Sequence, residues 1–278
     1  MAEVVAAQQA EFGNAVFPPK QPGAQATVGG LQCAWAEDDG SPWGGRRWTI
    51  LALPSVVADP GTVAALAEPV CDWDYDTRVC RMGVSVGDFW FLAAAAPMGE
   101  AEQAPVETLT ALVDAASGNA ASERTTVPAA RTPERWPIVA CAELGERMHL
   151  TEVLGEGYWS GRSEGSRQPE DDLYEHAGVR QFCQFGPDES VSGKIGLVTM
   201  TTAPGGAWIW SSEDDAVGEA VSVAGAEQAR RIVGPGAIRD RDTVRATDGT
   251  NLIDVWAVGE GVTAPDIVER AIAALRQD

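Results

Sequence analysis

The sequence predicts an α+β fold in two similar domains, each an antiparallel sheet with N- and C-terminal helices packed on it. Short runs rich in β-favouring residues, such as 47–53 and 197–202, recur in both halves of the chain and predict strands. A helical pattern follows a proline near the end of each half and predicts a closing helix. The two halves also align on each other, which indicates that one α+β unit is present twice.

The alignment of the two halves joins Cys33 to Cys183 and Pro54 to Pro204 at one common offset. A slightly larger offset places Asp88-Phe89-Trp90 on Asn251-Leu252-Ile253. The closing helices match at apolar positions with helical spacing, Leu109, Leu112, Val113 and Ala116 in the first half and Val268, Ala271, Ile272 and Leu275 in the second. We therefore predict a first repeat over residues 1–116, a polar, proline-bearing linker over 117–135 and a second repeat over 136–278.

Within each repeat, apolar periodicity and the positions of glycine and proline predict the elements in order. In the first repeat they predict a helix over 1–13, strands over 31–36 and 47–53, a short helix over 62–67, a cysteine-closed loop over 72–81, a strand over 89–94 and a helix over 106–116. In the second they predict a helix from 141 to 155, a charged loop to 176, strands at 183–185, 197–202, 207–210, 243–247 and 252–258, a short helix over 226–232 and a closing helix over 265–275.

The charge balance excludes several classes of partner. Asp and Glu total 41 against 20 Lys and Arg, which gives a formal net charge of -21. A surface this acidic repels phosphate backbones and anionic lipid, so we expect no nucleic-acid partner. No apolar run approaches the roughly 20 residues of a membrane-spanning helix, and no signal peptide follows Met1. We expect contact with a membrane only through an anchor upstream of this chain.

The five cysteines have no zinc-site spacing, so they are either free thiols or disulfides. The repeat favours a disulfide between Cys141, which opens a helix, and Cys183, which lies in the following strand. Cys71 and Cys80 have no counterpart in the second half and most simply close a small loop or hairpin. Disulfides persist in oxidising compartments, so this pairing predicts an exported protein. Five reduced thiols in a cytosolic protein are the alternative.

The remaining cysteine, Cys33, is expected to be unpaired. When Gly13 is laid on Gly155, the counterpart of Cys141 falls upstream of Met1. We therefore expect the first repeat to be truncated at its N-terminal end, so that Cys33 has no partner.

Two stretches match the serine-hydrolase pattern G-x-S-x-G, at Ser85 and at Ser163. That pattern works when a strand leads into the serine and a helix leaves it, but a strand follows Ser85 and a polar loop surrounds Ser163. His149 and His176 have acidic neighbours in the sequence, without a visible pocket or partner for a general base. The sequence therefore predicts no catalytic residue, and a serine hydrolase is the least favoured alternative.

No metal or cofactor site is predicted. Asp72, Asp74 and Asp76 alternate like the start of a calcium loop, but Thr77 and Gly83 stand where an EF-hand has its glycine and glutamate. No nucleotide-binding motif is present.

The run Trp208-Ile209-Trp210 places two indoles on one face of an expected strand. Core packing is the first interpretation of these indoles, and a face that stacks a sugar or an apolar ligand is the second.

One stretch of the second half resembles a known family. It contains Cys141-Ala-Glu-Leu144, a helix ending at Leu154-Gly155, and then Phe182-Cys183-Gln-Phe185. This pattern resembles the exported actinobacterial lipoprotein domains of the DUF3558 type, which read C-x-x-L…L-G…C-x-W. The pattern is also loosely similar to the extracellular sensor domains of mycobacterial serine/threonine kinases. The resemblance covers residues 136 to about 200 best. It implies export, a lipid anchor or membrane segment upstream, and a helix-on-sheet fold with a disulfide. This chain departs from the pattern in its two copies, its missing anchoring cysteine and its extra pair Cys71 and Cys80.

From these observations we expect a non-catalytic extracytoplasmic protein of the cell envelope that binds a small molecule or an envelope protein. The second hypothesis is a carbohydrate or cell-wall binding module that uses exposed tryptophans, with Trp208 and Trp210 as the stacking residues.

Overall fold

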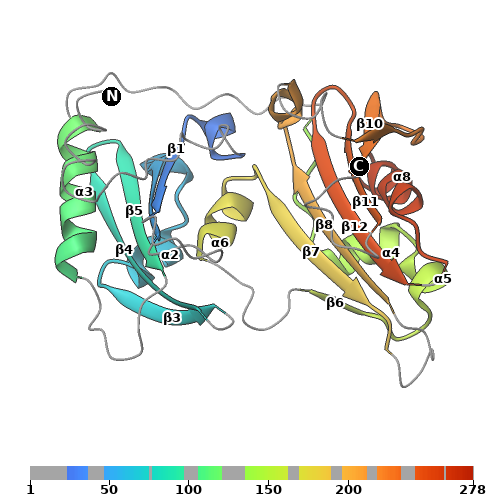
Figure 1. Ribbon diagram of the computed structural model, residues 1–278, viewed down its shortest axis with the longest axis horizontal. Coiled ribbons are helices and arrows are strands. Elements are labelled where there is room, and N and C mark those ends of the chain that lie inside the picture. Colours follow the sequence, from blue (N-terminus) through green and yellow to red (C-terminus); the bar gives the residue numbers. More distant parts are fainter. Residues whose placement is uncertain are drawn as a thin grey trace. The chain divides into compact units, whose positions relative to one another are not determined.

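The computed structural model of the protein describes residues 24–36, 47–74, 77–96, 106–120, 135–161, 169–188, 196–211, 218–232, 242–259 and 261–277. They form a five-stranded and a seven-stranded antiparallel sheet with helices, which confirms the predicted α+β class (Figure 1). The chain divides into two compact units. Unit 1 comprises Met1–Ala130 with Gln168–Ala177, and unit 2 comprises Arg131–Arg167 with Gly178–Asp278.

Unit 1 is built on the sheet β1-β2-β5-β4-β3. Its described elements are η1 (Ala24–Val28), β1 (Leu31–Ala36), β2 (Arg47–Pro54), η2 (Ser55–Val57), α2 (Pro60–Ala65), β3 (Val70–Asp74), β4 (Thr77–Val86), β5 (Phe89–Ala96), α3 (Val106–Ala120) and α6 (Pro169–His176). Helix α2 begins after an N-cap, Asp59, whose carboxylate accepts the backbone N–H of Thr62 at 2.7 Å. The helix predicted over 1–13 lies outside the described residues.

Unit 2 is built on the sheet β6-β7-β8-β12-β11-β10-β9. Its described elements are α4 (Cys141–Arg147), α5 (Leu150–Leu154), β6 (Trp159–Gly161), β7 (Gln181–Gly186), β8 (Gly196–Ala203), η3 (Ala207–Ser211), β9 (Glu219–Ala220), β10 (Gln228–Arg231), β11 (Asp242–Thr247), β12 (Leu252–Gly259) and α8 (Ala264–Leu275). Helices α4, α5 and α8 share one apolar core with the sheet. Among the described residues, no helix is both long and apolar enough to cross a membrane.

The two sheets repeat the same strand pairing. Cys33 pairs with Ile50 in unit 1 and Cys183 with Met200 in unit 2, so an offset of 150 residues carries one pair onto the other. In the later strands, Met82 opposite Ala93 matches Val244 opposite Val255, at an offset of 162. The sequence alignment of these strands was wrong by one residue, since the pairing matches Trp90 with Leu252 and not with Ile253. Because side chains alternate along a strand, that difference moves every residue to the other face of the sheet.

The closing helices bury the faces that the alignment predicted. Leu109, Leu112 and Val113 of α3 pack with Ile50, Phe91 and Ala93 of the sheet of unit 1. In unit 2, α8 buries Val268, Ala271, Ile272 and Leu275 in the same way, on the sheet residues Met200, Ile253 and Val255. Each buried side chain of this size contributes about 1.5–3 kcal/mol, so these two contacts stabilise each unit substantially.

The opposite faces of the two sheets differ in polarity. In unit 1, Leu51 and Leu92 alternate with the residues under α3 and are buried. Helix α6 lies over this face, because Arg81 and Gln32 on it contact Glu170 and Tyr174 of the helix. The residues of unit 2 that match Leu51 and Leu92 are polar, Thr201 and Asp254.

The structure corrects several sequence predictions. The charged loop predicted up to residue 176 contains strand β6 and helix α6, and the loop predicted over 72–81 is the β3–β4 hairpin. Residues 207–210, predicted as a strand, lie in the 3-10 helix η3, because Pro204 and Gly205 end β8 and the Ile209 N–H bonds back to the Gly206 carbonyl at 2.9 Å. Residues 226–232, predicted as a helix, contain strand β10, whose pairing with β11 overrides local propensity. Residues 117–120 of the predicted linker belong to helix α3. Residues 168–177 of the predicted second repeat belong to unit 1.

Both predicted disulfides are present. Cys71 and Cys80 face each other across the β3–β4 hairpin, and Cys141 at the start of α4 is bonded to Cys183 in β7. Cys33 is a free thiol. Its strand position matches that of Cys183, and it lies on the sheet face that packs against α3, because its partner Ile50 does. In the chain-entropy model, the bridge over 42 residues stabilises the fold by about 4 kcal/mol and the bridge over 9 by about 2.5 kcal/mol.

We expect one free thiol per chain. Alkylation of denatured, unreduced protein followed by peptide mass spectrometry should label Cys33 alone. In the native protein the same labelling should be slow at neutral pH, because burial raises the pKa of Cys33 and so lowers the thiolate fraction. Labelling of Cys141 or Cys183 in carefully unreduced protein would contradict the disulfide assignment.

The ion pair beneath α6 should stabilise unit 1. Arg81 Nε lies 3.3 Å from Glu170 Oε1, and their side chains are 5% and 19% exposed. Glu170→Gln leaves a buried guanidinium without its carboxylate, so we expect a loss of about 3 kcal/mol in the free energy of unfolding. Urea unfolding followed by tryptophan fluorescence measures it. Glu156→Gln, the same change at an exposed position, is the control, and an equal effect of both variants would contradict the expectation.

Candidate functional site

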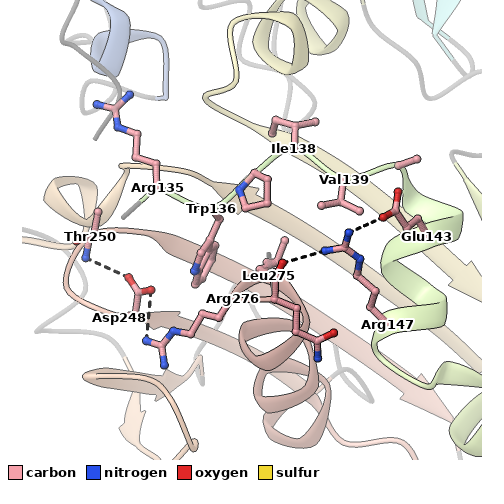
Figure 2. Close-up of a pocket in the computed structure, with 13 residues that line it drawn as sticks. Arg135, Trp136, Ile138, Val139, Glu143, Arg147, Asp248, Thr250, Leu275 and Arg276 are labelled. Atoms are coloured by element: carbon pink, nitrogen blue, oxygen red, sulfur yellow. Dashed lines mark hydrogen bonds and ion pairs between the residues drawn. The ribbon is translucent and has the colours of Figure 1, made fainter. Parts of the chain in front are cut away.

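Unit 2 contains an open cavity of about 800 Å³. One wall is the extended segment 135–140 that leads into α4, and the opposite wall is the end of α8 together with the β11–β12 turn (Figure 2). Its lining combines charged and apolar residues: Arg135, Trp136, Pro137, Ile138, Val139, Ala140, Glu143, Arg147, Asp248, Thr250, Leu275, Arg276 and Gln277. All of them belong to unit 2, so the cavity is a feature of that unit alone.

Hydrogen bonds centred on Asn251 hold the first wall. Asn251 is fully buried, and its Oδ1 accepts the backbone N–H groups of Trp136 and Gly205, both at 3.0 Å. A second bond fixes the other end of the segment, where the Gln181 side-chain amide donates to the Val139 carbonyl at 2.5 Å. The segment is therefore fastened at both ends before α4 begins.

Asp248 organises the β11–β12 turn. Its Oδ1 accepts the backbone N–H groups of Thr250 at 3.1 Å and Asn251 at 2.7 Å. The Asn251 amide donates to both carboxylate oxygens at 3.2 Å. These bonds fix the carboxylate at the rim of the cavity, with its side chain only 8% exposed.

Two arginines extend along the cavity from different elements (Figure 2). Arg147, from α4, points toward the end of α8, where its Nη1 donates to the Gln277 carbonyl at 3.2 Å, and its Nη2 pairs with Glu143 at 2.5 Å. Arg276, at the end of α8, donates from Nη2 to the Gly225 carbonyl at 2.9 Å and lies 3.5 Å from Asp248 Oδ2. The two guanidinium groups are thus held in place by the fold while remaining partly exposed, at 26% and 49%.

Trp136 contributes an apolar surface with one unsatisfied polar atom. The side chain lines the cavity and is 4% exposed. Its indole Nε1 has no hydrogen-bond partner among the described residues. A buried donor without an acceptor costs about 1–3 kcal/mol.

The serine and histidine patterns of the sequence do not form a site in the described structure. Ser85 lies near the end of β4, and the chain turns at Gly87, where φ is 58°, directly into β5. That is a hairpin, not the strand-to-helix elbow that a serine nucleophile needs. His149 is an exposed residue between α4 and α5, His176 ends α6 with Nδ1 3.6 Å from Asp59, and Ser163 lies outside the described residues.

The tryptophans and aspartates that form patterns in the sequence do not form a binding site in the described structure. In η3, Trp208 is 39% exposed and Trp210 is 5% exposed, so the two indoles do not form one exposed platform. Trp210 packs instead with Ala203 and Leu252. Asp72 is an exposed residue of β3, and Asp76 lies outside the described residues. Within the described ranges, no group of three or more potential metal ligands comes together.

Sequence reasoning missed the cavity because its parts lie in three distant segments, 135–147, 248–250 and 275–277. One signal was visible in retrospect. Arg135, Arg147 and Arg276 are three of only 20 basic residues in a chain of net charge -21. Their convergence depends on the packing of α4 beside α8, which periodicity within each helix does not reveal.

Comparisons with known proteins leave the family open. No family model and no curated protein matches the sequence. Two solved structures align along most of the chain. The di-domain ARO/CYC StfQ from the steffimycin biosynthetic pathway has 13% identity and a TM-score of 0.16, over 97% of this chain and 85% of that one. DynU16, a putative protein in the dynemicin biosynthetic locus, has 12% identity and a TM-score of 0.15, over 98% and 89%. Similarity this low assigns neither fold nor function.

Asn251 should be essential for the wall of the cavity. Asn251→Ala removes the acceptor of one buried and one partly buried N–H group, so we expect a loss of about 3 kcal/mol in the free energy of unfolding. Hydrogen exchange should become faster at the Trp136 and Gly205 amides. Thr250→Ala, in the same turn, is the control. If Asn251→Ala leaves both amides as protected as the control does, the role given to Asn251 is wrong.

Proposed function

We propose that this chain is a non-catalytic, exported binding protein of the cell envelope that holds a small molecule in the cavity of unit 2. The observation that carries the proposal is a cavity of about 800 Å³ whose walls are fixed by buried hydrogen bonds. Ligand sites are typically preformed concave surfaces that combine apolar residues with a few fixed polar groups. The lining of this cavity has that composition.

Export is supported by the two disulfides. Such bonds are rare in reducing compartments and persist in oxidising ones. The resemblance of residues 136 to about 200 to exported lipoprotein domains of the DUF3558 type agrees with this location, and it suggests attachment to the cell surface through a segment upstream. The high negative charge disfavours nucleic acid as a partner.

The absence of catalysis is part of the proposal and rests on the chemistry of the cavity. Its charged groups are arginines and two carboxylates, and each carboxylate is engaged by an arginine. A general base must be free to accept a proton from a substrate, whereas each of these carboxylates is hydrogen-bonded to an arginine side chain. The cavity is therefore suited to holding a ligand rather than to transferring a proton.

The proposal is tested by isolating the protein from its natural host without denaturation. Fractionation should place it outside the cytoplasm, and native mass spectrometry should detect a bound small molecule. Ala140→Trp fills the cavity from an exposed position on its rim, so we expect this variant to lose the bound mass. Ala142→Trp, two residues further on and outside the cavity lining, is the matched control. A cytoplasmic protein, or a bound mass that Ala140→Trp retains, would contradict the proposal.

A further inference from the structure

The two arginines of the cavity retain hydrogen-bond donors for a ligand. A guanidinium group has five N–H donors. Within the described part of the chain, Arg276 uses only Nη2, so Nε and Nη1 have no protein acceptor. Arg147 uses Nη1 and Nη2 and keeps Nε. Hydrogen bonds to the protein already hold both guanidinium groups in place. Binding a ligand therefore costs little additional side-chain entropy.

The charge of the lining differs in sign from the charge of the chain. The chain has 41 acidic and 20 basic residues, whereas the cavity is lined by three arginines and two carboxylates. Glu143 is paired with Arg147 and Asp248 with Arg276, and Arg276 still has unused donors. Guanidinium groups form strong, directional bonds with carboxylate and phosphate oxygens.

The rest of the lining is apolar on one side. Trp136, Ile138 and Leu275 are apolar residues of the cavity lining (Figure 2). A purely polar ligand such as a free inorganic anion would leave this surface in water. A ligand with an apolar portion would cover it and gain about 25 cal/mol for each Å² removed from water.

Together these features define the class of ligand. We infer that the cavity binds a small molecule with one anionic headgroup, a carboxylate or a phosphate, and a short apolar portion. Arg276 binds the headgroup, and Trp136 and Leu275 contact the apolar portion. This inference rests on the proposed function, because it describes the occupant of the same cavity.

The test uses four eight-carbon probes that differ in their headgroups: the anionic octanoate and octyl phosphate, the neutral 1-octanol and the cationic octylamine. Each is titrated into the ¹⁵N-labelled full chain while the tryptophan indole N–H signals are recorded. The Trp136 signal is assigned with Trp136→Phe, and the buried Trp90 of unit 1 is the internal control. We expect octanoate or octyl phosphate to shift the Trp136 signal with an affinity at least about tenfold above that of 1-octanol and octylamine.

Two arginine variants test the headgroup contact. Arg276→Gln should weaken binding of the anionic probe about tenfold or more. Arg270→Gln is the matched control on the same helix, since Arg270 contacts Glu152 and the carbonyls of Met148 and His149 and does not line this cavity. It should bind the anionic probe like the wild type.

The outcomes separate this inference from the proposed function. Equal or tighter binding of 1-octanol or octylamine at Trp136 would overturn the anionic class while leaving the cavity a binding site. A shift of Trp136 that Arg276→Gln and Arg270→Gln weaken equally would overturn the assigned headgroup contact. If no probe shifts Trp136, both the ligand class and the cavity as a small-molecule site are overturned. Preference for octanoate over octyl phosphate, or the reverse, identifies the headgroup.

Discussion

The attachment of α4 to the sheet fixes one wall of the cavity in unit 2. The disulfide from Cys141 to Cys183 joins the first residue of the helix to a fully buried position in β7. Arg147 and Glu143 project from this helix, and the cavity wall 135–140 leads directly into it. The hydrogen bonds to Asn251 and from Gln181 hold segment 135–140, and the disulfide fixes the residue that follows it. The covalent bond and the buried amides thus fix the same wall from two directions.

The matching strand pairs describe an architecture that the two units share, but the cavity lies in unit 2 alone. Both units place a closing helix on the same face of the same five-strand pattern, with matching cross-strand pairs. The units then diverge on the opposite face, where Leu51 and Leu92 in unit 1 are replaced by Thr201 and Asp254 in unit 2. This difference agrees with the element that covers the face in unit 1. An apolar face needs a covering helix, which α6 supplies in unit 1, whereas a polar face tolerates water.

The sequence predicted the parts of the fold that depend on local patterns. Apolar spacing identified both closing helices, and the pairing of cysteines followed from the repeat together with the nearness of Cys71 and Cys80. It failed where tertiary contacts decide the outcome. Gln228 to Arg231 form a strand because β11 offers hydrogen bonds, and η3 forms because a turn reverses the chain after Ala203. The cavity belongs to this second group, since Arg147 and Arg276 meet only after α4 and α8 have packed.

The path of the chain through α6 makes the two units topologically interleaved. The backbone leaves unit 1 after Ala130, returns to it for Gln168–Ala177 and then re-enters unit 2. Neither unit is therefore one contiguous stretch of the sequence, whereas each predicted repeat is. A fragment that ends at the linker would lack the helix that covers Leu51, Leu92 and Arg81. Residues 131–167 of unit 2 precede residues 168–177 of unit 1 in the chain, so a cut between the two predicted repeats does not separate the two units.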